Sequence, residues 1–235
     1  MKKFYVKIVT LTICCSCWGQ NKSVSLEDIW QKYSFYPEYV WGLKSMNNGD
    51  YYTQLDRDNN VSKLNKYSYR TGRRLSTIAD SKKLGIDLED YTFSEDEQKV
   101  LFATETENIY RYSSRSIFYV YDIRSRKLTK LLDDKVMYAT FSPDGSKVAF
   151  VKDNNLYLKD LASMKETQIT NNGINNQVIN GATDWVYEEE FGLVKAFFWS
   201  PDGSKIAFYR FDENEVKKFS MDMFQGELYP TQYEF

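Results

Sequence analysis

The 235-residue chain contains no histidine. A Ser-His-Asp or Cys-His catalytic arrangement therefore cannot be completed within it, and zinc sites of the HExxH or Cys2His2 type are excluded. Lysine or an N-terminal amine can also act as a general base, so nucleophilic catalysis is disfavoured rather than excluded. We expect no catalytic residue, no cofactor and no metal ion in this chain.

Cysteine is almost absent, and all three cysteines lie within residues 14–17. They belong to an apolar stretch that follows three lysines and is too short to span a bilayer, which is the layout of a secretory signal peptide. Cleavage after Gly19 makes residues 1–19 the signal peptide and leaves a mature chain with neither disulfides nor a transmembrane span. Lipidation at Cys17 is the alternative, although the residues before it match a lipoprotein signal poorly. We expect an exported protein that is periplasmic, secreted or on the cell surface.

The chain also lacks an excess of either charge, because 31 Lys and Arg face 33 Asp and Glu. A formal net charge of -2 gives no general attraction to nucleic acid, and we expect no nucleic-acid partner. Hydrophobic residues make up 42% of the chain and aromatic residues 17%, which argues against a disordered chain.

Only four prolines occur, and two of them belong to an internal repeat. The sequence FSPDGSKVAF at 141–150 recurs as WSPDGSKIAF at 199–208. A degraded copy occupies 93–102, and a fainter one begins at Trp41 and includes Asn47–Asp50. The copies are about 50 residues apart, which is the spacing of propeller blades.

Each copy has the chemistry of a β-hairpin. Proline presets the first dihedral of the turn, aspartate bonds the nearby backbone, and glycine accepts the left-handed position. A second hairpin follows three of the copies, at 119–132, 156–170 and 66–78. Four strands per repeat predict an all-β fold, a β-propeller of about three to four blades, rather than a β-sandwich.

The sequence predicts three segments: the signal peptide at 1–19, a lead-in at 20–40 and a partial propeller at 41–235. One helix is expected, near Ser25–Lys32, with Ser25 as its cap. A four-bladed closure would use the whole repeat region, but the last copy has barely begun its second hairpin at Phe235. An incomplete propeller leaves blade edges open, so we expect the chain to be the front part of a longer protein.

The segment before the last copy, 183–192, reads TDWVYEEEFG. A run of three glutamates is usually a solvated surface, but here apolar residues flank it on both sides and favour carboxylates that are held in place. Adjacent carboxylates repel each other unless a cation lies between them, so a primary ammonium group is a candidate ligand. Metal binding is a weaker alternative, because we expect a strand here and neighbouring side chains on a strand point to opposite faces.

Arg111 is a second candidate, because it lies between two tyrosines in an insertion between Ala103 and Phe118. It could be a surface cation stacked on aromatic rings. Alternatively, its planar guanidinium could bind a carbonyl or carboxylate in a pocket.

The sequences DWVYEEE at 184–190, WSPDG at 199–203 and FDENEV at 211–216 resemble the N-terminal propeller of dipeptidyl peptidase IV, a prolyl oligopeptidase-type serine peptidase. The resemblance implies an eight-bladed propeller followed by an α/β-hydrolase domain that carries the Ser-Asp-His triad and cleaves after Pro or Ala. It implies that Glu189 and Glu190 bind the free amino terminus of a peptide substrate and that Arg111 contacts a substrate carbonyl. Glu188 is assigned no such role.

This chain departs from the family because it has no hydrolase domain and only about half of the propeller. We therefore expect the isolated chain to be inactive, and the resemblance is compatible with a homodimer of the full-length enzyme. Two alternatives remain within or outside the enzyme class. The whole protein could be a tripeptidyl peptidase or a post-proline endopeptidase, or the chain could be a non-catalytic envelope propeller that binds a peptide or protein partner.

Overall fold

The computed structural model describes residues 23–37, 39 and 42–234. The predicted signal peptide and Trp41, the anchor of the faintest repeat copy, lie outside the described residues. The chain divides into two units, Met1–Val40 and Trp41–Phe235. Within the described part, no helix combines the length and apolarity needed to cross a membrane.

The first unit contains the predicted helix, α1 (Leu26–Trp30). Its cap is a capping box, in which the Ser25 hydroxyl accepts the Asp28 amide and the Asp28 carboxylate accepts the Ser25 amide. Lys32 pairs with the same carboxylate at 2.9 Å, one helical turn later.

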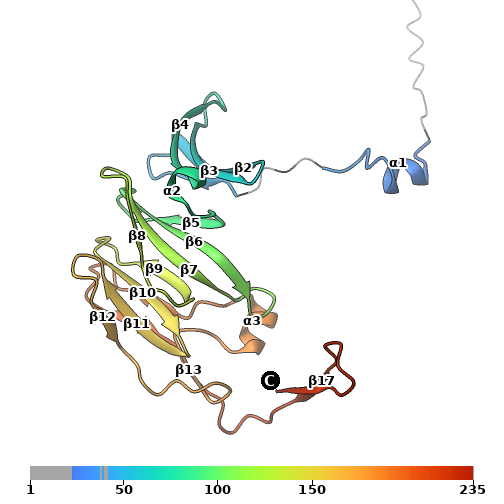
Figure 1. Cartoon of the computed structure of the whole chain (residues 1–235), viewed down its shortest axis with the longest axis vertical. Coiled ribbons are helices and arrows are strands. Elements are labelled where there is room, and N and C mark those ends of the chain that lie inside the picture. The colour runs from blue at the N-terminus through green and yellow to red at the C-terminus, as the bar shows by residue number, and fades with distance from the viewer. Residues whose placement is uncertain (1–22, 38, 40–41, 235) are drawn as a thin grey trace, which may run out of the picture. The chain divides into compact units, whose positions relative to one another are not determined.

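The second unit contains three four-stranded antiparallel sheets, each formed by consecutive strands (Figure 1). Their strands are β1 (Lys44–Ser45), β2 (Tyr51–Asp58), β3 (Val61–Ser68) and β4 (Arg74–Asp80); β5 (Asp90–Phe93), β6 (Lys99–Asn108), β7 (Ser114–Asp122) and β8 (Lys127–Lys130); and β9 (Met137–Phe141), β10 (Lys147–Lys152), β11 (Asn155–Asp160) and β12 (Glu166–Gln168). Successive four-stranded meanders are propeller blades, so the predicted propeller is confirmed and the sandwich alternative is wrong.

A fourth blade begins after the third. It contains the pair β14 (Phe197–Trp199) and β15 (Ile206–Phe208), and the remaining strands form two further pairs. These are β13 (Val178–Asn180) with β16 (Arg210–Asp212), and β17 (Ser220–Met223) with β18 (Thr231–Glu234). Two short helices, α2 (Ser81–Leu84) and α3 (Trp185–Phe191), were not expected from the sequence, which predicted a single helix.

The repeat copies form the first hairpin of each blade, as predicted. In the copy at 141–150, the Asp144 carboxylate accepts the Ser142 hydroxyl at 2.6 Å and the Ser146 amide at 3.0 Å. Gly145 has a φ of 63°, the left-handed region that glycine adopts without strain. The degraded copy uses Glu97 at the equivalent position with a φ of 57°, so the turn survives the loss of its glycine.

The aspartates of these turns make stability depend on pH. Hydrogen bonds from the Ser200 hydroxyl and from the Ser204 amide and hydroxyl lower the pKa of Asp202 from 3.8 to about 2. Because the folded-state pKa is depressed, the stabilisation is present above pH 3.8 and is lost as the pH falls through about 2. We expect the Asp202→Asn variant to lose less stability than the wild type over this range. Urea midpoints measured between pH 5 and pH 2 test this, and parallel pH profiles would contradict it.

The hydrophobic core lies between blades, because successive residues of each central strand point to opposite faces of the sheet and so pack against different neighbouring blades. On β6, Val100 and Phe102 pack with the first blade, whereas Leu101 packs with the third. On β10, Val148 and Phe150 pack with the second blade, whereas Ala149 and Val151 pack with Phe197 of the fourth. Each junction therefore has its own core.

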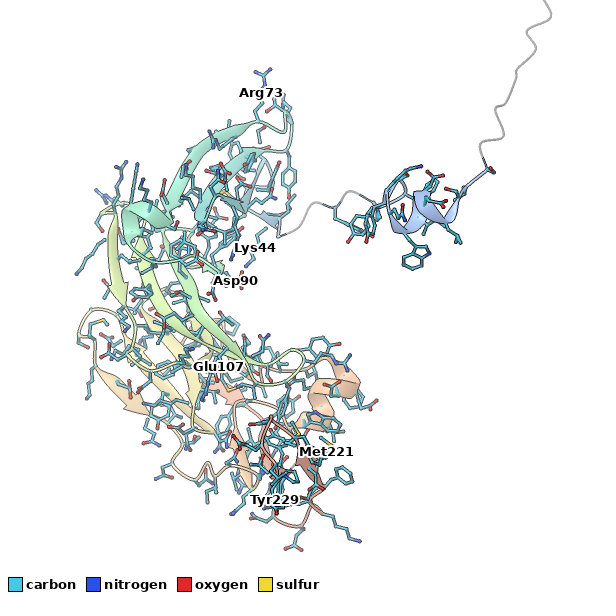
Figure 2. All side chains as sticks on the ribbon, turned by 45° about the vertical axis from the view of Figure 1, so that its right-hand side comes forward. Lys44, Arg73, Asp90, Glu107, Met221 and Tyr229 are labelled. Atoms are coloured by element: carbon cyan, nitrogen blue, oxygen red, sulfur yellow. The ribbon has the colours of Figure 1, made fainter. Side chains whose placement is uncertain are left out.

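Polar contacts add to the junction between the first two blades. The Lys44 ammonium lies 2.8 Å from an Asp90 oxygen and 4.3 Å from the centre of the Tyr91 ring. Figure 2 shows Lys44 of β1 close to Asp90 of β5, which belongs to the next sheet. The Tyr91 hydroxyl lies 2.9 Å from the hydroxyl of Thr53, so an interior polar group of the second blade is bonded to the first.

Candidate functional site

The Arg111 segment forms the end of the β6–β7 hairpin. The predicted insertion is a continuation of the two strands, and it is not a separate loop. The register shifts between Thr104 and Glu107, and Arg115 then binds both oxygens of Glu107 at 2.9 and 3.1 Å. The Ile109 amide donates to the Ser113 carbonyl at 2.9 Å. We call residues 110–113, which close this hairpin, the Arg111 turn.

The glutamate triplet lies on α3, which lies beside the Arg111 turn (Figure 1). The helix begins where the Asp184 carboxylate accepts the Tyr187 amide at 2.8 Å, and it ends at Gly192, which has a φ of 63°. The expectation of a strand here is therefore wrong. On a strand, successive side chains would point alternately to two opposite faces, whereas on a helix they are rotated by about 100° around the helix axis.

The three glutamates consequently have three different environments. Glu188 is buried, with 3% of its surface exposed, and its Oε1 accepts the amides of Tyr112 and Ser113 at 2.7 and 2.8 Å. Glu189 is half-buried and Glu190 is exposed. The flanking Trp185, Val186, Tyr187 and Phe191 are all exposed, whereas the buried Glu188 carboxylate is bonded to the backbone of the Arg111 turn.

Arg111 and Glu189 form an ion pair, with the Nε atom 2.9 Å from Oε2 and 3.4 Å from Oε1. The two side chains differ in exposure, because 67% of the Arg111 side chain is accessible but only 19% of the Glu189 side chain. The guanidinium therefore keeps donors available to solvent or to a ligand. Glu190 follows on the next helical position and makes no ion pair with the described residues. The structure thus brings two of the three candidate residues into contact and places the third beside them.

Two tyrosines adjoin this group. Burial, a hydrogen bond to Tyr233 at 3.0 Å and the negative charge of Glu188 raise the pKa of Tyr110. Burial and the same carboxylate raise the pKa of Tyr138. Both hydroxyls therefore remain protonated at neutral pH, and they can act as neutral hydrogen-bond donors beside the carboxylates.

The arrangement suits an organic cation better than a metal ion. No group of three or more Asp, Glu or Cys residues in the described ranges is placed to hold a metal. Glu189 and Glu190 offer carboxylates at the surface, and Arg111 offers an adjacent cation. A ligand that carries an ammonium group and a carbonyl a short distance apart would complement both charges.

The importance of Glu188 could not be deduced from the repeat pattern. A helix could have been predicted from Asp184 as an N-cap, three residues before Tyr187, and from Gly192 after the last helical residue. Which glutamate faces inward depends on contacts between residues 75 and 76 positions apart, and no local pattern reports such contacts.

Comparison with known proteins identifies relatives of this chain. The family model described as "Dipeptidyl peptidase IV (DPP IV) N-terminal region" matches residues 94–235. Prolyl endopeptidase FAP of Homo sapiens is 30% identical over 200 residues, which cover 84% of this chain and 25% of that protein. Dipeptidyl peptidase 4 of Sus scrofa is 34% identical over 148 residues, which cover 62% of this chain and 19% of that protein.

A solved structure is similar to this chain in both fold and sequence. The crystal structure of Porphyromonas gingivalis dipeptidyl peptidase 4 matches with a TM-score of 0.80 and 37% identity, covering 92% of this chain and 31% of that one. The chain therefore spans between about a fifth and a third of the length of these related proteins.

Proposed function

Since the chain belongs to the dipeptidyl peptidase IV family through its N-terminal region, we propose that it is the substrate-recognition propeller of a serine-type dipeptidyl peptidase. The full-length enzyme would remove Xaa-Pro and Xaa-Ala dipeptides from peptide N-termini, with the nucleophile supplied by a hydrolase domain outside this chain. In this proposal the propeller controls access to the active site and binds the substrate amino terminus.

The Arg111–Glu189 ion pair is the observation that carries the proposal. Glu189 and Glu190 would bind the substrate ammonium group, and Arg111 would donate to a carbonyl of the bound dipeptide. Anchoring one end of the peptide sets the distance to the bond that is cleaved, so the product length follows from the site geometry. Binding would also exchange part of the Arg111–Glu189 contact for contacts to the ligand.

The sequence supports further proposals about the whole protein. We propose export through the signal peptide at 1–19, with the mature enzyme in the periplasm, at the cell surface or secreted, and with lipidation at Cys17 as the alternative. Peptides with a free N-terminus are the proposed partners. A homodimer of the full-length enzyme is part of the same proposal, because it follows from the family and not from any contact within this chain.

Blocking the substrate amine tests the proposed function. For the full-length enzyme we expect cleavage of a Gly-Pro substrate and loss of cleavage when the same substrate is N-acylated, because an acylated amine carries no charge for the glutamates. The measurement is kcat/KM for the two substrates at equal enzyme concentration. Equal cleavage of both would contradict the dipeptidyl activity and would favour an endopeptidase, in agreement with the name of the human relative.

A further inference from the structure

The Arg111 turn is attached to α3 through one carboxylate. Glu188 Oε1 accepts the amides of Tyr112 and Ser113 at 2.7 and 2.8 Å, and only 3% of the residue is exposed. Hydrogen bonds to an ionised acceptor are about twice as strong as neutral ones. A buried carboxylate without such donors would strongly destabilise the folded chain. The free energy of burying Glu188 therefore depends on the turn remaining in place.

A residue with strained backbone lies near the same turn. Tyr138 of β9 is half-buried, and the pKa of its hydroxyl is raised by burial and by the charge of Glu188 and lowered by the Ser113 side chain, which places it close to both groups. Tyr138 has a φ of 56°, a left-handed conformation that is strained for a bulky residue. The β9–β10 register also shifts near this point, between Ala149 and Val151. Strained backbone persists where the surrounding contacts hold it, and such positions cluster at functional sites.

The geometry points to Glu188 as a positioning residue that sets the Arg111–Glu189 separation by clamping the Arg111 turn onto α3. Glu188 and Glu189 are consecutive on one short helix, and the turn amides that Glu188 accepts directly follow Arg111 in the chain. One short connection runs along the helix from Glu188 to Glu189, and the other runs along the turn from Tyr112 to Arg111. Together they set the distance between the guanidinium and the Glu189 carboxylate. Glu188 itself is too buried to contact a ligand at the surface, so its role differs from those proposed for Glu189 and Glu190.

Amide exchange tests this clamp without reference to activity. In the whole chain, Glu188→Ala is expected to increase hydrogen exchange at the Tyr112 and Ser113 amides by at least about tenfold, because both lose a charge-assisted acceptor. Glu188→Gln retains an acceptor oxygen and is expected to restore part of the protection. Glu190→Gln changes an exposed carboxylate on the same helix and is the matched control, with exchange at both amides unchanged.

Two outcomes would overturn the clamp. The first is unchanged exchange at Tyr112 and Ser113 in Glu188→Ala. The second is an equal increase at those amides and at amides in the centre of β3, which would show a general loss of stability. Far-UV circular dichroism of each variant identifies a chain that has failed to fold. If Glu188→Ala does not fold, Glu188→Gln provides the measurement. Its exchange rates at the Tyr112 and Ser113 amides are then expected to lie between those of the wild type and those of an unprotected turn.

A kinetic measurement extends the inference to recognition, and this arm rests on the proposed function. In the full-length enzyme, Glu188→Ala is expected to lower kcat/KM for a free-amine substrate by about tenfold, with Glu188→Gln restoring most of it. The exposed Glu215→Gln variant is the control. Faster exchange in Glu188→Ala, together with full activity after loss of Glu189 and Glu190, would refute the proposed function and leave the clamp standing. Unchanged exchange would refute the clamp alone.

Discussion

Replacing Glu189 and Glu190 together with alanine is expected to reduce kcat/KM of the full-length enzyme for a Gly-Pro substrate by about a hundredfold or more, since removing one side of a close charge pair costs roughly 2–5 kcal/mol. The substrate ammonium would lose both carboxylates, and the uncompensated Arg111 guanidinium would repel it. The loss should therefore exceed the sum of two ordinary surface substitutions. Steady-state kinetics with the free-amine substrate measures the effect.

The matched control for this double variant removes two glutamate charges at positions outside the candidate site. Glu215 and Glu227 are both exposed, and replacing both with alanine is expected to leave kcat/KM within about twofold, because surface substitutions away from a site have small effects. Wild-type activity in the Glu189→Ala, Glu190→Ala enzyme would show that this chain does not recognise the substrate amine. Circular dichroism of both double variants confirms that the comparison is made between folded proteins.

Truncating Phe150 to alanine is expected to lower the free energy of unfolding by about 3–5 kcal/mol. Phe150 is fully buried at the centre of β10, and its ring stacks on Tyr157 with 5.7 Å between centroids and 4° between planes. It belongs to the core between the second and third blades, where Leu101 and Val148 surround it. The variant loses the transfer free energy of the ring and leaves a cavity that neighbouring strands cannot fill.

Urea denaturation of the whole chain measures this loss, with two comparisons. Phe150→Leu retains most of the apolar volume and is expected to cost less than Phe150→Ala. Phe224→Ala removes the same ring from a residue that is 72% exposed, and its effect should lie within about 0.5 kcal/mol. A Phe150→Ala loss no larger than the Phe224→Ala loss would show that the core between these blades does not limit stability.

The blades could be predicted from the sequence because their information is local. Serine, aspartate and glycine at fixed offsets specify the turn through hydrogen bonds within five residues, as between Ser142 and Asp144. The central strands are short runs of mainly apolar residues, buried without interruption from Val100 to Thr104 on β6 and from Val148 to Val151 on β10, so both could be recognised from composition and spacing. The helix α1 was found for the same reason, since its cap and first turn lie within four residues of one another.

The candidate site could be predicted only in part, because its geometry depends on non-local contacts. Resemblance to a known motif indicated Arg111, Glu189 and Glu190, whose roles in recognition remain predictions. The helical conformation of the triplet was missed, although Asp184 and Gly192 mark its ends. The inward orientation of Glu188 could not be found, because its donors come from a hairpin of another blade and only the packed structure brings them within reach.

Each central strand contributes residues to the cores of two junctions between blades, and this affects how cooperatively the blades unfold. Because β6 and β10 contribute one face to each neighbour, the stability of the array is a sum of nearest-neighbour couplings, as in a one-dimensional chain of linked units. A substitution at Val148 weakens one coupling, whereas a substitution at Ala149 weakens the next. Opening would then begin at the weakened junction and propagate outward, so adjacent residues of one strand can control separate unfolding events.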